Sequence, residues 1–219
     1  MNKIFSFFLL ISAVVFIFSG NLFSADDNID KILANIEKKN SSVKDMQAEY
    51  VQTITYFATD EKLKSEGIFK HKKPDYINLV QLLPTRQYTY IDGKNITTYV
   101  PANKQAVVEK WKNVVDGDVI LTSVFKFTKN FKTLKKDYNI VLKDQTNIDY
   151  SFLIKPINKK EDWTMAITVS KANSLVTASS FNNGNFVVDI EIKNYKINNN
   201  FSNDIFRFVA PKNVDVIEL

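Results

Sequence analysis

The chain has 219 residues, 45% of them hydrophobic and 24% charged, with a formal net charge of +5, one histidine and no cysteine. These counts exclude disulfides and leave too few ligands for a zinc site, so a packed core must stabilise the fold alone. The 29 basic residues are scattered among 24 acidic ones, a pattern of a solvated surface that does not predict nucleic-acid binding.

The first 25 residues form a separate segment. Lys3 gives a charged start, residues 4–18 are apolar, and the segment ends in the small residues Ser24 and Ala25. This pattern is typical of a secretory signal peptide, and we expect cleavage after Ala25. The alternative is a retained membrane anchor, although the run is short for a span of ~20 residues. Removal of Lys3 would lower the net charge from +5 to +4.

Residues 26–219 are enough for one domain with its own core. Because a bacterial lipoprotein carries its lipid on a cysteine, a chain without cysteine is expected to be exported with no lipid anchor. The domain begins with a predicted amphipathic helix that runs to about Lys39. Its apolar positions are Ile29, Ile32, Leu33 and Ile36, at the spacing i, i+3, i+4 and i+7. Whether this helix is fixed on a sheet or moves as a lid is left open.

From Val43 the hydrophobic period changes from 3.6 to 2, which predicts a long strand. The residues on one face of this strand are Met46, Ala48, Tyr50, Gln52, Ile54 and Tyr56. Residues 63–70 predict the next strand, with Gly67 as a bulge or bend. Such a bend lets a sheet curl.

Residues 67–105 are predicted to be a meander of antiparallel strands. Lys72, Lys73 and Pro74 form a basic corner between two strands, and Asp92-Gly93 is expected to be a two-residue hairpin turn. A further strand is predicted between residues 104 and 111.

A second helical segment follows Asp116-Gly117-Asp118. Its apolar residues lie at helical spacing and are Ile120, Val124, Phe127, Phe131 and Leu134. One helix and two short helices both fit this pattern. A basic amphipathic segment could lie on a membrane surface, but packing on a core is the favoured interpretation. Asp116 and Asp118 are interpreted as a helix cap, because the other ligands of a calcium loop are missing.

The rest of the chain is predicted to be β structure. Strands are expected at residues 138–143, 148–155, 163–170, 175–181 and 186–195, separated by turn residues. No segment of helical length lies between them, which favours an antiparallel sheet over a parallel α/β sheet.

Several motifs, taken in order, resemble the LolA family of periplasmic lipoprotein carriers. They are Tyr50-x-Gln52, the Lys72-Lys73-Pro74 corner, the strand with Tyr76, Ile77 and Leu79, the Asp92-Gly93-Lys94 hairpin, Tyr99-x-Pro101-x-x-x-Gln105, and Phe206-x-Phe208-x-x-Pro211. The resemblance covers nearly the whole chain after the signal peptide. The expected fold is mainly β (α+β). It is a single, strongly curved antiparallel sheet, an open or half barrel, with helices covering its concave face.

Catalytic and cofactor chemistry is not predicted. A serine hydrolase would have to use His71, but there is no Gly-x-Ser-x-Gly elbow, and His71 is interpreted as a plain strand-end residue. The five glycines are dispersed, so no phosphate-binding loop is expected. We therefore predict no enzyme, no cofactor and no metal, with a periplasmic hydrolase as a remote alternative.

The resemblance implies a periplasmic carrier that shelters the acyl chains of lipoproteins in a hydrophobic cavity and moves them from the inner to the outer membrane. It also implies an inner-membrane ABC transporter that loads the carrier and an outer-membrane receptor lipoprotein that unloads it. We expect a monomer. The alternative is a binding module of the same fold that senses lipids or lipoproteins.

The resemblance also assigns roles to particular residues. Residues expected at the ligand are Ile77, Leu79, Tyr50, Ile29, Leu33, Leu121 and Val124. Lys73 stands where the family commonly has an arginine that bonds to the lid helices and holds the empty form shut. Lysine lacks the planar fork of arginine, and the alternative for Lys73 is a solvated turn residue.

Overall fold

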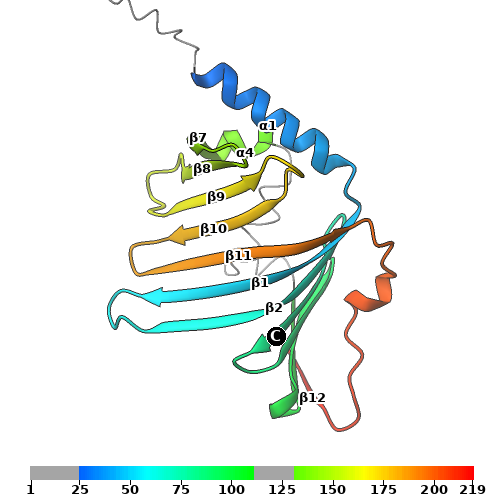
Figure 1. Cartoon of the computed structure of the whole chain (residues 1–219). Helices are drawn as coiled ribbons and strands as arrows, with labels where there is room; N and C mark the ends of the chain where they lie inside the picture. Colours follow the sequence, from blue (N-terminus) through cyan, green and yellow to red (C-terminus); the bar gives the residue numbers. More distant parts are fainter. Residues whose placement is uncertain (1–24, 111–130) are drawn as a thin grey trace, which may run out of the picture.

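The computed structural model describes residues 25–110 and 131–219, and this part of the chain forms one large open sheet with few helices (Figure 1). Its strands are β1 Asp45–Tyr56, β2 Lys62–Lys72, β3 Tyr76–Leu83, β4 Gln87–Asp92, β5 Asn95–Val100, β6 Gln105–Lys110, β7 Tyr138–Gln145, β8 Asp149–Pro156, β9 Thr164–Ser170, β10 Val176–Asn182, β11 Phe186–Ile197 and β12 Asp215–Glu218. Its helices are α1 Ala25–Ser41 and α4 Phe131–Asp137, with 3₁₀ turns η1 Pro101–Asn103 and η2 Asn203–Phe206.

The long strand β1 lies at the centre of the sheet. In the described part of the chain the strand order is β12-β6-β5-β4-β3-β2-β1-β11-β10-β9-β8-β7. One meander, β2–β6, extends from one side of β1, and a second, β7–β11, reaches its other side through β11. Figure 1 shows the sheet strongly curved, with β3–β6 turned out of the plane of β8–β11.

Each predicted strand of the two meanders is confirmed, and where the prediction gave strand ends the observed ends lie within two residues of them. The period-2 patterns explain this agreement, because alternate residues of a strand point to the same face. In β1 the buried members of the predicted face include Met46 and Tyr50, and in β9 the alternate residues Met165, Ile167 and Val169 are buried. Hydrophobic burial on one face therefore fixes the register of these strands.

Turns alternate between two ends of the sheet. The tip end carries the β1–β2 turn (residues 57–61), the β3–β4 turn (84–86) and the β10–β11 turn (183–185). The base end carries the corner at Pro74 and the turn at Gly93. Helix α1 runs directly into β1, so its C-terminal end also lies at the base end (Figure 1).

Gly67 was predicted to be a bulge or bend, and it lies opposite a bulge whose extra residue is Leu82 of the neighbouring strand β3. The β2–β3 register shifts between Glu66 and Gly67. A Cβ on Gly67 would lie 2.0 Å from the carbonyl oxygen of Val80 and 3.0 Å from Cε1 of Tyr50. Only glycine lets the β3 backbone and the Tyr50 ring approach β2 this closely.

The predicted hairpin between β4 and β5 is present, but its turn is displaced by one residue. The two residues between the strands are Gly93 and Lys94, and of these Gly93 has a positive φ of 87°. Asp92 stays in β4, and its Oδ1 accepts hydrogen bonds from the backbone N–H groups of Lys94 (2.9 Å) and Asn95 (2.8 Å). The aspartate therefore stabilises the turn through its side chain and leaves the positive φ to glycine.

The prediction of a purely antiparallel sheet is wrong at one edge. β12 pairs with β6 in parallel, with Asp215 opposite Gln105 and Glu218 opposite Val108. The reason is the path of the chain after β11. Residues 198–214 leave the base end and bring the chain back to the tip end before β12 begins, so β12 starts beside the start of β6.

We expect Gly67→Ala to lower the free energy of unfolding by about 2 kcal/mol or more, because the new methyl group would force the β3 backbone away. Thermal denaturation should show a midpoint lower by roughly 5 °C. Gly184→Ala is the matched control, because Gly184 has a positive φ of 82° but nothing within 4 Å of a Cβ. A loss no greater for Gly67→Ala than for Gly184→Ala would contradict the close approach.

Candidate ligand-binding face of the sheet

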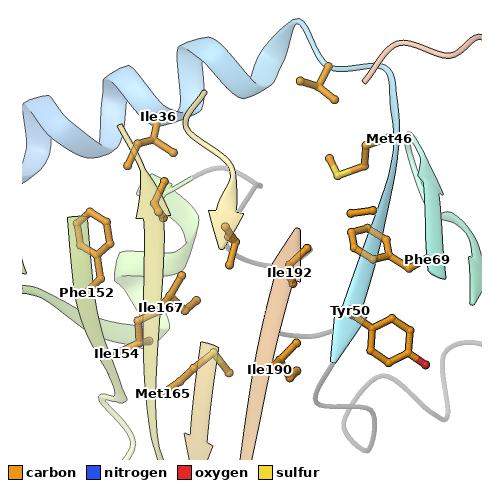
Figure 2. Packing of buried hydrophobic residues seen from close by; sticks show 14 of the residues in the cluster. Ile36, Met46, Tyr50, Phe69, Phe152, Ile154, Met165, Ile167, Ile190 and Ile192 are labelled. Atoms are coloured by element: carbon orange, nitrogen blue, oxygen red, sulfur yellow. The ribbon is translucent and has the colours of Figure 1, made fainter. Parts of the chain in front are cut away.

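One face of the sheet carries a continuous apolar cluster, and we term it the inner face. The cluster joins side chains of α1 and α4 to side chains of strands on both sides of β1. Figure 2 shows Ile36 on α1 and, on the strands below the helix, the labelled members Met46, Tyr50, Phe69, Phe152, Ile154, Met165, Ile167, Ile190 and Ile192. All of these side chains are buried.

A row of aromatic rings crosses the inner face near the tip end. The centroid distances are 5.5 Å for Tyr138–Trp163, 5.6 Å for Trp163–Phe181, 6.2 Å for Phe181–Phe186 and 6.0 Å for Phe186–Tyr56. We term these five residues the aromatic row. Tyr138, Trp163, Phe181 and Phe186 pack against the cluster, Tyr56 packs against Phe186, and all five are only partly buried. The sequence analysis placed Tyr56 on one face of its strand but did not predict the row, although each member is an aromatic residue at or beside the end of a strand.

The structure brings five of the seven expected ligand residues into the apolar cluster. Ile77 and Leu79 lie in β3, Tyr50 lies in β1, and Ile29 and Leu33 lie in α1. All five are buried, with exposed fractions of 8% or less. The other two, Leu121 and Val124, lie outside the described residues.

Lys73 donates hydrogen bonds to the C-terminal end of α1. Its Nζ lies 2.8 Å from the carbonyl oxygen of Asn40 and 3.3 Å from that of Ser41. These carbonyls belong to the last turn of the helix, where backbone oxygens lack intrahelical donors and the helix dipole favours a cation. Burial lowers the pKa of the Lys73 ammonium from its usual value, as expected when part of its hydration is lost.

The same helix end is bonded to the other meander. The side-chain Nδ2 of Asn40 donates to the carbonyl oxygen of Ser174 at 3.0 Å, and Nζ of Lys39 donates to the carbonyl oxygen of Lys171 at 3.3 Å. Residues 171–175 connect β9 to β10 at the base end. The end of α1 therefore bridges the β2–β3 corner and the β9–β10 turn, with Asn40 bonded to both.

The opposite end of α1 is held by α4. Lys135 of α4 forms an ion pair with Asp30 of α1, and Phe131 of α4 belongs to the apolar cluster. Phe131 and Leu134 were predicted to lie on a helix, and both do. The part of the predicted helical segment before residue 131 lies outside the described residues.

A second set of polar contacts holds the chain after β11 at the base end. The carboxylate of Asp45 accepts hydrogen bonds from the backbone N–H groups of Asn199 (2.6 Å) and Phe201 (3.3 Å). Nζ of Lys72 donates to the carbonyl oxygen of Phe201 at 2.7 Å. The adjacent lysines of the basic corner thus have different partners, since Lys72 contacts the C-terminal segment and Lys73 contacts α1.

A hollow of about 410 Å³ lies on the outer face of the sheet, over β1, β11, β10 and β9. Its lining includes Val51, Thr53, Ala166, Thr168, Ser180 and Asp189. An acyl chain in this hollow would displace water from the hydroxyl and carboxylate groups of the lining, and it could not hydrogen-bond to them in place of the water. The outer hollow is therefore a poor site for such a ligand.

No metal site is found among the residues that the structure describes, since none of their His, Asp and Glu side chains gather in groups of three or more. His71 is buried in β2, with Met46 and Ile77 as its cross-strand neighbours. Its prediction as a strand-end residue holds for its position, but its burial was not foreseen. Within residues 25–110 and 131–219, no helix combines the length and apolarity needed to cross a membrane.

Comparison with known proteins gives consistent matches. The family model described as "Outer membrane lipoprotein carrier protein LolA" matches residues 41–209. A protein named outer-membrane lipoprotein carrier protein from Francisella tularensis subsp. novicida is 26% identical over 212 residues, which cover 95% of this chain and 96% of that protein. A protein of the same name from Legionella pneumophila is 22% identical over 219 residues and covers both chains fully. The crystal structure of MucB has a TM-score of 0.53 at 12% identity, covers 89% of this chain and 66% of that chain, and shows a shared fold.

We expect Lys73→Met to loosen the C-terminal end of α1, because methionine cannot donate to the carbonyls of Asn40 and Ser41. If the partly exposed contact contributes about 1 kcal/mol, amide hydrogen exchange in the last turns of α1 should be about fivefold faster. Lys72→Met is the matched control and should leave exchange in α1 unchanged, because Lys72 contacts Phe201 instead. Equal exchange in α1 of Lys73→Met and the unmodified protein would show that the contact does not hold the helix.

Proposed function

The chain belongs to the LolA family of outer membrane lipoprotein carrier proteins, and from this premise we propose that it shelters the acyl chains of lipoproteins on the inner face of its sheet. In this proposal the protein is a periplasmic carrier that moves lipoproteins from the inner to the outer membrane. Helices α1 and α4 cover the concave face in the empty form. The relatives are named as carriers and not as enzymes, which supports a binding function without catalysis.

The observation that carries the proposal is the apolar inner face. It is lined by aliphatic and aromatic side chains from both meanders, and the described helices add more of the same kind. Burial of one methylene group contributes roughly 0.8 kcal/mol, so an acyl chain of about a dozen carbons gains on the order of 10 kcal/mol from such a surface. Because an acyl chain makes no hydrogen bonds, the inner face can bind it without polar side chains.

If the helices cover the inner face in the empty form, as proposed, loading requires that a helix give way. The α1 helix contributes its buried apolar residues to the cluster, and an acyl chain could replace them with contacts of the same chemistry. The free energy lost when the helix side chains leave the cluster is then close to the free energy gained from the acyl chain, so little energy is needed for loading or release. Hydrogen bonds at the base end, each worth about 0.5–1.5 kcal/mol, would set the bias toward the closed form. This is the proposed role of Lys73 as a latch.

The seven expected residues keep their proposed roles as ligand contacts. Ile77, Leu79 and Tyr50 would contact the acyl chain on the sheet, and Ile29 and Leu33 would leave the sheet with α1. Leu121 and Val124 would add contacts from the second helical segment. The aromatic row, being only partly buried, gives a route by which a chain could enter from the tip end.

The proposed partners follow from the family. An inner-membrane ABC transporter would load the carrier, and an outer-membrane receptor lipoprotein would unload it. Residues 1–25 would direct export to the periplasm, and residues 26–219 would act there as a single-domain monomer.

The decisive experiment places a photoreactive amino acid at Leu79 in cells of the source species. Mass spectrometry of the cross-linked products should then identify acylated lipoproteins. The matched control is the same group at Val80, which neighbours Leu79 in β3 but points to the outer face and should capture far less of them. Capture of a single regulatory protein, without lipoproteins, would instead indicate a sensor of the same fold.

We expect Ile77→Glu to reduce binding of a fluorescent fatty-acid probe by at least about tenfold, because a carboxylate on the inner face opposes an acyl chain. Circular dichroism should verify that the variant still folds, since Ile77 is buried. Val80→Glu on the same strand tests for a general effect of added charge. Unchanged probe binding by a folded Ile77→Glu protein would place the ligand elsewhere.

A further inference from the structure

The tip end of the sheet presents large apolar side chains to water on neighbouring hairpins. The exposed fractions are 47% for Phe57, 47% for Leu63, 38% for Leu82 and 52% for Leu83. Phe57 begins the β1–β2 turn, Leu63 lies at the start of β2, and the two adjacent leucines end β3. We term these four residues the apolar rim.

The register of the strands gives the rim a stepped shape. Pairing of β2 with β3 stops at Glu66 opposite Leu83, whereas pairing of β2 with β1 continues to Lys62 opposite Thr55. The β1–β2 hairpin therefore projects beyond β3, as its cyan strands do in Figure 1. At about 3.3 Å per residue, Leu63 lies on the order of 10 Å beyond Leu83, and Phe57 lies on the order of 20 Å beyond it.

Exposed cations surround the rim in excess over acids. Lys62 and Lys64 flank Leu63, Arg86 lies in the β3–β4 turn, and Lys104 lies in the β5–β6 turn at the same end. The acidic residues in these turns and at the start of β2 are Asp60 and Glu61. Glu66, which lies opposite Leu83 and is partly buried, is a third carboxylate at the rim. Four cations against three carboxylates leave a small net positive charge, which complements anionic headgroups.

The arrangement fits a fluid surface better than a protein groove. A protein partner recognises a contiguous, shaped patch, whereas these side chains protrude at separate points, one in a turn and three at strand ends. Apolar residues on a protruding turn and on strand ends, with lysine and arginine nearby, match the boundary between lipid headgroups and acyl chains, where apolar side chains enter and cations meet phosphates.

We propose that the tip end binds directly to the surface of a phospholipid bilayer, with the apolar rim inserted below the headgroups. This membrane contact goes beyond the carrier function, because it requires neither cargo nor a protein partner. It also brings the aromatic row, which lies near the same end of the inner face, close to the lipid surface.

The test uses the protein purified after export and processing, with sucrose-loaded vesicles of phosphatidylethanolamine and phosphatidylglycerol that contain no lipoprotein. The protein should sediment with these vesicles, and less with vesicles of phosphatidylcholine alone. The double variant Leu82→Glu/Leu83→Glu should reduce the partition coefficient by at least about tenfold. Phe57→Ser should reduce it in the same direction by a smaller factor.

Ile148→Glu is the matched control. Ile148 is 70% exposed but lies in the β7–β8 turn at the base end, so the same chemical change should leave sedimentation unaltered. Fatty-acid probe binding should persist in the double variant, which separates the rim from the inner face. Absence of vesicle binding, or equal loss in the rim variants and in Ile148→Glu, would overturn the proposal even if the protein carries lipoproteins.

Discussion

Burial of the inner face is the constraint on which the rest of this structure depends. Strands on both sides of β1 direct their apolar side chains to one side, and pairing between strands does nothing to remove those side chains from water. Other parts of the chain must therefore lie against them. Helix α1 supplies a matching apolar stripe, and its position across the ends of the strands in Figure 2 sets where polar contacts can form.

The two ends of the sheet differ in how they are closed. At the base end, the terminus of α1 leaves backbone carbonyls that need donors, and Lys73 provides them from the opposite corner. The Asp45 carboxylate holds the chain after β11 at the same end by accepting hydrogen bonds from two of its backbone N–H groups. At the tip end the aromatic row is only partly buried, and neighbouring strand ends expose leucines. Directional polar contacts thus fix one end, while apolar contacts at the other can be exchanged.

This asymmetry connects the fold to the proposed carrier. A ligand that is apolar along its length can exchange with helix side chains without leaving buried polar groups unsatisfied, provided that the polar contacts stay at the margin. The described polar contacts of α1 meet that condition, because the hydrogen bonds of Asn40 and Lys73 lie at the end of the helix and not within the apolar cluster.

The sequence alone determined the strands of the two meanders, the first helix and the buried side of β1, because these depend on local periodicity and on the conformational limits of single residues. It also placed Lys73, Ile77 and Tyr50 at positions that the fold brings to the inner face or its edge. It did not determine the partners of Asn40 and Asp45, the aromatic row or the parallel β12, since each depends on residues far apart in the chain. Asn40 and Ser174 are 134 positions apart, and only the curvature of the sheet brings them within hydrogen-bonding distance.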